Sequence, residues 1–352
     1  MGRRPVARDP GPLPAREPPA SEHGAALLTV LLLVAILSVV TAVALDRLTL
    51  ASRMTRNIVS ADQGRAYLLT GEQMVANLVT DLVSVNPDRT TLQGDWLGRD
   101  QTISVPGGLV TARLIDRGNC FNLNSLVVGP EQPGGADADP SGARLVARPA
   151  GIAQFAALMR LLGVDHNIAL QIAISAADWI DSDSEPGNGG AEDNYYAGFD
   201  PAYRPANTLM ADPSELLMVN AMTPDIYQRI RPWVCALPTT RLSAININTL
   251  LPGQAVLLAM LAPDALGLDE ARQVLAQRPP EGYGSVNIFW SLPPLVRLAA
   301  PQDVQDQTVA KTRWFEVVLR ADLGGDLVEE IVLIDAETQP ARLVRRQWGD
   351  ES

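Results

Sequence analysis

Histidine, cysteine and aromatic residues are scarce in this chain of 352 residues. The sequence holds two histidines and two cysteines, and aromatic residues make up 5% of it. Such low counts exclude a metal site built from several histidine or cysteine ligands, and also a small scaffold held together by many disulfides. Leu, Val, Ala and Ile must therefore supply most of the packing in a chain long enough for about two or three folding units.

Basic residues are also few. Lys and Arg total 28 against 40 Asp and Glu, which gives a formal net charge of -12 and a pI near 4.7. Nucleic acid is therefore not expected as a main partner, because binding to its phosphates depends on cationic side chains. Catalytic motifs are missing as well: His23 and His166 stand in no Ser-His-Asp arrangement, and no Gly-rich loop ends in Gly-Lys-Ser/Thr. We therefore expect a protein that is not an enzyme.

One long hydrophobic run lies near the N-terminus. Residues 1–24 are rich in Pro and Arg, and Ala25–Leu45 then continues without a charge. A helix of about 21 residues spans roughly 31 Å, which is the thickness of the hydrocarbon core of a bilayer. Helical spacing goes on without proline as far as Pro87. The sequence predicts one helix from about Ala25 to Ser84, of which the first third is soluble in lipid and the rest amphipathic.

The start of the hydrophobic run resembles the cleavage site of class III prepilins, because His23-Gly24 directly precedes it. The resemblance implies that a prepilin peptidase cuts after Gly24 on the cytoplasmic side and that Ala25 becomes the N-methylated first residue. The helix would stay in the bacterial inner membrane as a single span, with the large domain in the periplasm. An uncleaved signal anchor is the alternative interpretation.

Thr29 occupies the fifth position of the chain that this cleavage would leave. Most pilins and pseudopilins carry a glutamate there, and the K-type minor pseudopilin is the family that ordinarily lacks it. Thr29 therefore makes the chain similar to that family.

The remainder of the chain alternates between strand and helix patterns. Apolar residues alternate around Leu109–Ile115, the composition of 129–142 indicates a loop, and strand patterns return near the C-terminus. The pattern predicts an α+β fold with a helical insertion. The expected segments are a leader at 1–24, the helix at 25–84, the first part of the α+β domain at 85–125, the insertion at 126–300 and C-terminal strands at 301–352.

Two stretches of the insertion carry the most specific resemblance. The stretch from Ala177 to Pro238, which contains ADWIDSDSEPGNGGAEDNYYAGF, resembles the core signature of general secretion pathway protein K, and Asn246–Pro252, NINTLLP, is a second similar piece. This resemblance implies a pseudopilin fold, a long helix packed on an antiparallel sheet, with an all-α insertion of two SAM-like units at about 150–238 and 245–300. It also implies a minor pseudopilin at the tip of the type II secretion pseudopilus, above the major pseudopilin and together with the I- and J-type minor pseudopilins.

Two alternatives remain at this point. Glu215–Ile230 and Ile247–Leu261 resemble helix-hairpin-helix units, which would make the protein a membrane-anchored DNA-binding protein. The first hairpin lacks a glycine that would let backbone amides approach a phosphate, and its surroundings are acidic, so packing is the favoured use of these helices. A minor pilin of a type IV pilus is the second alternative.

An acidic loop follows the helical segment that ends near Asp178 and Trp179. Carboxylates at alternate positions and a Gly-rich turn are suited to wrapping Ca²⁺, which accepts six to eight oxygen ligands in irregular geometry. The spacing is not that of an EF-hand, and a solvated acidic loop is the alternative. The resemblance to K-type pseudopilins implies calcium, with Mg²⁺ as the second choice. The candidate ligands are Asp181, Asp183, Glu192 and Asp193, with Asn188 and Asp200 as further candidates.

Cys120 and Cys235 complete the set of predicted sites. Two cysteines in an exported domain are more often paired than free, although two buried thiols are the alternative. A disulfide between them would connect the insertion to the α+β scaffold. Closing a loop of roughly 115 residues contributes at most about 4–5 kcal/mol to stability.

Overall fold

The computed structural model describes residues 22–129, 144–263 and 265–349. The chain divides into two units, Met1–Asp62 and Gln63–Ser352. The predicted loop at 129–142 and most of the predicted leader lie outside the described residues.

A single helix, α1 (Glu22–Val85), begins in the first unit, so the prediction of one continuous helix is confirmed. Its large apolar side chains from Leu27 to Ile58 are at least 50% exposed. The hydroxyls of Thr29, Ser38 and Thr41 donate hydrogen bonds of 2.7–2.9 Å to carbonyls one turn back, which satisfies these groups without water. By length and composition, this helix is able to cross a membrane.

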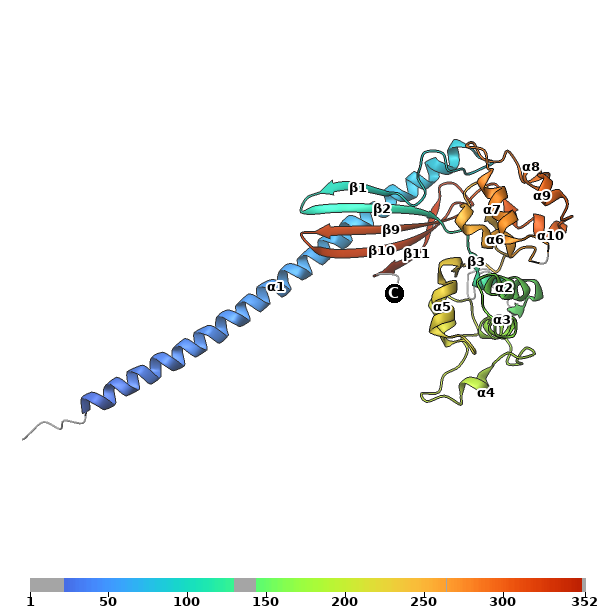
Figure 1. Cartoon of the computed structure of the whole chain (residues 1–352). Coiled ribbons are helices and arrows are strands. Elements are labelled where there is room, and N and C mark those ends of the chain that lie inside the picture. The colour runs from blue at the N-terminus through green and yellow to red at the C-terminus, as the bar shows by residue number, and fades with distance from the viewer. Residues whose placement is uncertain (1–21, 130–143, 264, 350–352) are drawn as a thin grey trace, which may run out of the picture. The chain divides into compact units, whose positions relative to one another are not determined.

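The second unit is built on a five-stranded antiparallel sheet with the strand order β1-β2-β9-β10-β11 (Figure 1). The strands are β1 (Asp100–Val105), β2 (Gly108–Asp116), β9 (Trp314–Leu323), β10 (Asp326–Asp335) and β11 (Arg342–Trp348). Gly324 and Gly325 form the two-residue turn between β9 and β10 with φ values of 67° and 98°, a conformation that favours glycine. The predicted C-terminal strands are therefore confirmed.

The C-terminal part of α1 packs on one face of this sheet. Leu68, Val75, Val79 and Val83 recur at helical spacing and are buried against apolar side chains of β2, β9 and β10. At the end of the sheet where β1 turns into β2, the hydroxyl of Tyr67 donates a hydrogen bond of 3.1 Å to the carbonyl of Pro106. These contacts fix α1 from Gln63 onward to the sheet.

The helical insertion interrupts the sheet between two neighbouring strands. The chain leaves the sheet after Asp116 and returns at Trp314, and Asp116 pairs with Phe315 across β2 and β9. The predicted range of the insertion, 126–300, is too narrow at both ends. The short, irregular segments that precede and follow its helices also lie outside the sheet. Residues 301–313 belong to the insertion and not to the C-terminal strands.

The insertion contains many short elements. Its helices are η1 (Leu123–Leu126), α2 (Pro149–Leu161), α3 (His166–Ile180), α4 (Asp193–Tyr196), η2 (Pro213–Met218), α5 (Pro224–Ile230), η3 (Arg231–Trp233), η4 (Pro252–Gln254), α6 (Ala255–Ala259), α7 (Leu268–Ala276), α8 (Val286–Trp290), α9 (Pro293–Val296) and α10 (Gln302–Gln305). Its strands form two-residue pairs: β3 (Phe121–Asn122) with β6 (Val234–Cys235), β4 (Val127–Val128) with β5 (Val146–Ala147), and β7 (Ile245–Asn246) with β8 (Thr308–Val309).

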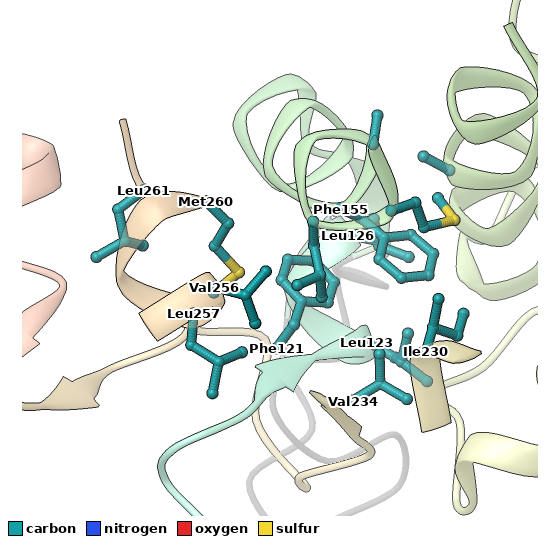
Figure 2. Close-up of a cluster of buried hydrophobic side chains, with 14 of the residues drawn as sticks. Phe121, Leu123, Leu126, Phe155, Ile230, Val234, Val256, Leu257, Met260 and Leu261 are labelled. Atoms are coloured by element: carbon teal, nitrogen blue, oxygen red, sulfur yellow. The ribbon is translucent and has the colours of Figure 1, made fainter. Parts of the chain in front are cut away.

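One hydrophobic core holds the insertion together. Its buried side chains form a single cluster that extends from Phe121 to Ala300. The ring of Phe121 stacks on Phe155 of α2 with 5.0 Å between the ring centroids. Figure 2 shows Val256 and Leu257 of α6 near Phe121, so both halves of the insertion contribute to this core. The two predicted SAM-like units therefore share a core and do not fold around separate ones.

Two buried links hold the start of the insertion. The disulfide lies within the insertion, because both cysteines fall between Asp116 and Trp314, and of the two links only the contacts of Asp116 reach the sheet. Cys120 and Cys235 form the disulfide expected from the sequence, with 5.9 Å between their Cα atoms. The buried carboxylate of Asp116 accepts hydrogen bonds of 2.5 Å from the hydroxyls of Thr249 and Thr312. It also accepts one of 3.3 Å from the side-chain amide of Asn119. Burial raises the pKa of Asp116 although these donors oppose the shift.

A buried charge cluster connects α1 to the two last strands. The guanidinium of Arg346 on β11 donates hydrogen bonds to both carboxylate oxygens of Glu72 on α1, and its Nε lies 2.8 Å from a carboxylate oxygen of Glu330 on β10. Burial acts to raise the pKa of Glu72, but its contacts with Arg346 and Glu330 lower it overall. Burial and the neighbouring Glu72 raise the pKa of Glu330 to about 8.

Replacing Glu330 is expected to change how stability depends on pH. Because folding raises the pKa of Glu330 to about 8, its contribution to stability is complete below about pH 4 and is lost as the pH rises through about 8. We expect the melting temperature of the wild-type protein to fall as the pH rises from about 5 to about 8, and that of Glu330→Gln to fall less over this range, by about 2–4 °C for each kcal/mol recovered. Fluorescence of the six tryptophans, all between Trp96 and Trp348, reports the melt of the detergent-purified chain. Parallel pH profiles for the two proteins would contradict this assignment.

Candidate metal centre

Helix α3 positions the first acidic residues of the predicted site. The helix begins after Asp165, whose carboxylate accepts hydrogen bonds from the backbone amides of Asn167 and Ile168. Its apolar side chains bury it in the insertion core, and it ends at Asp181. Asp178 and Asp181 therefore project from the rigid last turn of a packed helix.

Asp178 organises the loop that follows. Its carboxylate accepts hydrogen bonds from the backbone amides of Gly187, at 3.2 Å, and of Ala191, at 2.9 Å. A Cβ atom on Gly190 would lie only 1.8 Å from an oxygen of Asp178, so only glycine fits there. These contacts fold the loop back over the end of α3 and return Glu192 to the neighbourhood of Asp181.

Three carboxylates meet as a result. One oxygen from each of Asp181, Asp183 and Glu192 lies within 4.8 Å of the others. Asp181 and Glu192 are only 3% and 4% exposed. One oxygen of Asp181 and both oxygens of Glu192 are buried without a hydrogen-bond partner, an arrangement that is costly unless a cation neutralises it.

The raised pKa values of Asp181 and Glu192, like their missing hydrogen bonds, favour a cation at this centre. Burial raises the pKa of Asp181 to about 7, with a further contribution from the charges of Asp183 and Asp178. Burial also raises the pKa of Glu192 to about 7, with a further contribution from Asp181 and Asp178. Within the described residues, no Arg, Lys or His forms an ion pair with any of the three. The centre therefore lacks positive charge of its own.

The donor set fits a hard divalent cation. Carboxylate oxygens are the preferred ligands of Ca²⁺ and Mg²⁺, whereas Zn²⁺ and copper are usually held by histidine or cysteine. Three side chains supply only part of a calcium shell, so backbone carbonyls and water would have to complete it. The loop geometry is irregular, which suits Ca²⁺ better than the strict octahedron of Mg²⁺.

The other three predicted ligands are not part of this group. Asp193 forms an ion pair of 3.8 Å with the exposed Arg204. Asn188 and Asp200 are exposed. Asp193 and Asp200 are close in sequence to the centre, but their carboxylates are not among the three that meet there.

Asp178 is the residue that sequence reasoning missed. It was interpreted as the end of a helix, whereas its buried carboxylate accepts the backbone hydrogen bonds that shape the loop. The adjacent pair Gly189-Gly190 was the available signal, because a position that tolerates only glycine indicates a close approach of another group.

The long N-terminal helix, the five-stranded antiparallel sheet and the helical insertion define a pseudopilin-type subunit. A family model for type II secretion system protein K matches residues 119–239, and a second one matches residues 245–310. The chain belongs to the type II secretion system protein K family, and secretion is the process in which this family takes part.

Individual relatives support this assignment along most of the chain. The protein is 35% identical to type II secretion system protein K of Aeromonas hydrophila and 36% identical to that of Klebsiella pneumoniae, each match covering 93% of this chain and 97% of the relative. The structure is also similar to a chain in the crystal structure of the GspK-GspI-GspJ complex from enterotoxigenic Escherichia coli. That match has a TM-score of 0.70 and 28% identity, and it covers 84% of this chain and 99% of the other.

The metal-free protein is expected to lose stability as the pH rises through about 7. Folding raises the pKa of Asp181 and Glu192 to about 7, so the stability that their protonated forms contribute is complete below about pH 4 and is lost near neutrality. Between about pH 5 and pH 7 the melting temperature of Asp181→Asn/Glu192→Gln should fall several degrees less than that of the wild-type chain.

The matched control for this experiment is Asp200→Asn, which removes a nearby exposed carboxylate and should keep the wild-type slope. Glu330 titrates in the same range but is present in all three proteins. Melts in the presence of a chelator provide the measurement. Equal slopes for the double variant and the wild-type protein would contradict the raised pKa values.

Proposed function

We propose that this protein is the minor pseudopilin at the tip of the type II secretion pseudopilus, where it assembles with the I- and J-type minor pseudopilins above the major pseudopilin. The observation that carries the proposal is the match to protein K relatives over nearly their whole length, together with the similarity to a chain in a complex with GspI and GspJ. The role is structural and not catalytic.

The place of the insertion within the second unit supports a position at the tip. Helix α1 comes onto the sheet beside the β1–β2 turn, where Tyr67 bonds to Pro106. The insertion joins the sheet at the opposite ends of β2 and β9, next to the segment after α1, where the amide of Thr90 donates a hydrogen bond of 2.9 Å to the carbonyl of Ala310. A bulky insertion at that end would obstruct a subunit stacked above it, whereas a tip subunit has no neighbour there.

The N-terminal helix supplies the membrane anchor in this proposal. Ala25–Leu45 crosses the inner membrane, the prepilin peptidase removes the leader after Gly24, and Ala25 is N-methylated. Thr29 in place of the usual glutamate suits the top subunit, because no amine of a higher subunit has to be neutralised. A periplasmic location of the large domain agrees with the disulfide, which forms in oxidising compartments.

Calcium bound at Asp181, Asp183 and Glu192 is part of the proposal. The ion would neutralise three carboxylates and partner the buried oxygens of Asp181 and Glu192. Because Asp181 ends α3 and Glu192 precedes α4, one ion would join the two ends of the acidic loop. Its role is to hold the insertion in one shape.

Calcium is expected to stabilise the detergent-purified chain. At 100 times the dissociation constant a ligand adds about 2.7 kcal/mol, which in a domain of this size raises the melting temperature by about 5–10 °C. Glu192→Gln should lose most of this shift because it removes a ligand from the centre. Asp193→Asn should keep it, since Asp193 pairs with Arg204 and lies outside the centre. A midpoint that is the same with calcium and with chelator would remove the ion from the proposal.

Assembly is tested by co-expression of the full chain with the prepilin peptidase and the I- and J-type subunits. We expect the three pseudopilins to co-purify in detergent at a fixed ratio, and mass spectrometry to find N-methylated Ala25 as the first residue of this chain. Omitting the peptidase provides the control for processing. A folded chain that associates with neither subunit would refute the tip assignment.

A further inference from the structure

A polar pocket lies where the two ends of the insertion meet. Its volume is about 580 Å³, within the range of about 300–1,000 Å³ that small-molecule sites occupy. Three stretches of the chain contribute to its lining: 116–122 at the end of β2, 237–246, and 303–314 around β8. Arg148, directly before α2, also lines it. We call this feature the junction pocket, and none of its lining residues belongs to the metal centre.

Two cations of the junction pocket have no carboxylate of their own. Within the part of the chain that the structure describes, neither Arg148 nor Lys311 forms an ion pair, and both side chains are half-buried. The guanidinium of Arg148 donates a hydrogen bond of 2.7 Å to the carbonyl of Thr240, which is a neutral partner. Burial lowers the pKa of Arg148, and no carboxylate opposes the shift. These two side chains are therefore available to an anion.

The other charged side chains of the pocket limit which anion it accepts. Arg241 and Arg313 both pair with Glu337, at 3.2 and 2.8 Å, so they are already neutralised. Asp303 and Asp306 also belong to the lining and are exposed. They would repel a phosphate, which carries about two charges at neutral pH, more strongly than a carboxylate with a single charge. The charges therefore favour a carboxylate as the ligand group.

A buried oxygen in the same lining lacks a hydrogen-bond donor. The Nε2 of Gln307 donates a hydrogen bond of 3.1 Å to the carbonyl of Asp303, which assigns Oε1 as the acceptor end of the amide. Gln307 is only 5% exposed, and its Oε1 is buried without a partner, which is costly unless a ligand supplies an N–H group. Asp116, the buried carboxylate of the lining, already has its donors. The pocket is therefore matched to an N–H donor as well as to an anion.

Apolar side chains form another part of the lining. They are Leu237, Leu242, Val309 and Trp314. Leu237 and Trp314 are buried, and the other two are half-buried, so they offer a surface for one aliphatic side chain of a ligand. A carboxylate, an amide N–H and a side chain occur together on the last residue of a peptide.

We propose that the junction pocket binds the C-terminal residue of a peptide, with its carboxylate held by Arg148 and Lys311. The amide N–H of that residue donates to Oε1 of Gln307, and its aliphatic side chain lies against Trp314. Capture of a terminal carboxylate is a recurrent mode of peptide recognition. The inference depends neither on the position at the tip nor on the metal centre.

The first test is calorimetric titration of the detergent-purified full chain with four probes. Acetyl-Ala-Ala-Leu with a free carboxylate should bind, and its C-terminal amide should bind at least tenfold more weakly. The depsipeptide, in which an ester oxygen replaces the last amide N–H, should also bind more weakly, and inorganic phosphate should bind more weakly than the free acid. No binding of the free acid, equal binding of the acid and its amide or depsipeptide, or tighter binding of phosphate would overturn the proposal.

The second test places the ligand, because Lys311 is the only lysine of the chain. Saturating acetyl-Ala-Ala-Leu should lower the rate at which an amine-acylating reagent modifies Lys311 at least fivefold, as measured by mass spectrometry, and the amide should not. Full reactivity of Lys311 in the presence of bound peptide would put the peptide elsewhere and refute the assignment.

Substitution of the same residue provides an independent check. Lys311→Met keeps most of the apolar stem and should weaken binding of the free acid at least tenfold. Arg297→Met is the matched control, since Arg297 is an exposed cation outside the pocket and its loss should leave the affinity unchanged. Melting temperatures within about 2 °C of wild type show that both variants are folded. Equal affinities of the two variants would contradict the proposal.

Discussion

Antiparallel pairing of β2 with β9 is the constraint on which the rest of the second unit depends. The two strands are neighbours in the sheet, although about 200 residues separate them in the sequence, and the cost of closing so long a loop grows only slowly with its length. The insertion has a continuous hydrophobic core of its own, so it separates the two strands in the sequence without disturbing their pairing. The disulfide then fixes Cys120, near the start of the insertion, to Cys235 in its middle, and the hydrogen bonds from Thr249 and Thr312 to Asp116 fix the insertion to the end of β2.

Three of the groups of buried carboxylates in the described residues differ in what satisfies them, and the comparison distinguishes structural groups from a binding centre. Asp116 accepts hydrogen bonds from hydroxyl and amide groups and needs nothing further. Glu72 and Glu330 share the guanidinium of Arg346, and burial beside Glu72 raises the pKa of Glu330. Asp181 and Glu192 have neither a donor for their buried oxygens nor a cation in an ion pair within the described residues. Only this last group is incomplete without a ligand.

Sequence reasoning predicted the features that arise from local patterns. The uncharged run gave α1, the alternation near the C-terminus gave β9, β10 and β11, and the acidic loop contained all three residues of the centre. It placed the limits of the insertion wrongly, because strands of two residues such as β3 and β8 have no periodicity to detect. It also did not separate Asp183 from Asp193, since that distinction depends on how Asp178 folds the loop. The cluster of Glu72, Glu330 and Arg346 joins residues more than 250 positions apart and leaves no local signal.

The ends of the insertion have one further consequence. Because Asp116 and Phe315 are directly paired, the chain on either side of the insertion could be joined by an ordinary hairpin turn without moving any strand. The sheet is therefore continuous without the insertion, which enters it at a single position and has a hydrophobic core of its own. Such an arrangement lets the insertion change in sequence and size without altering the register of the strands on either side.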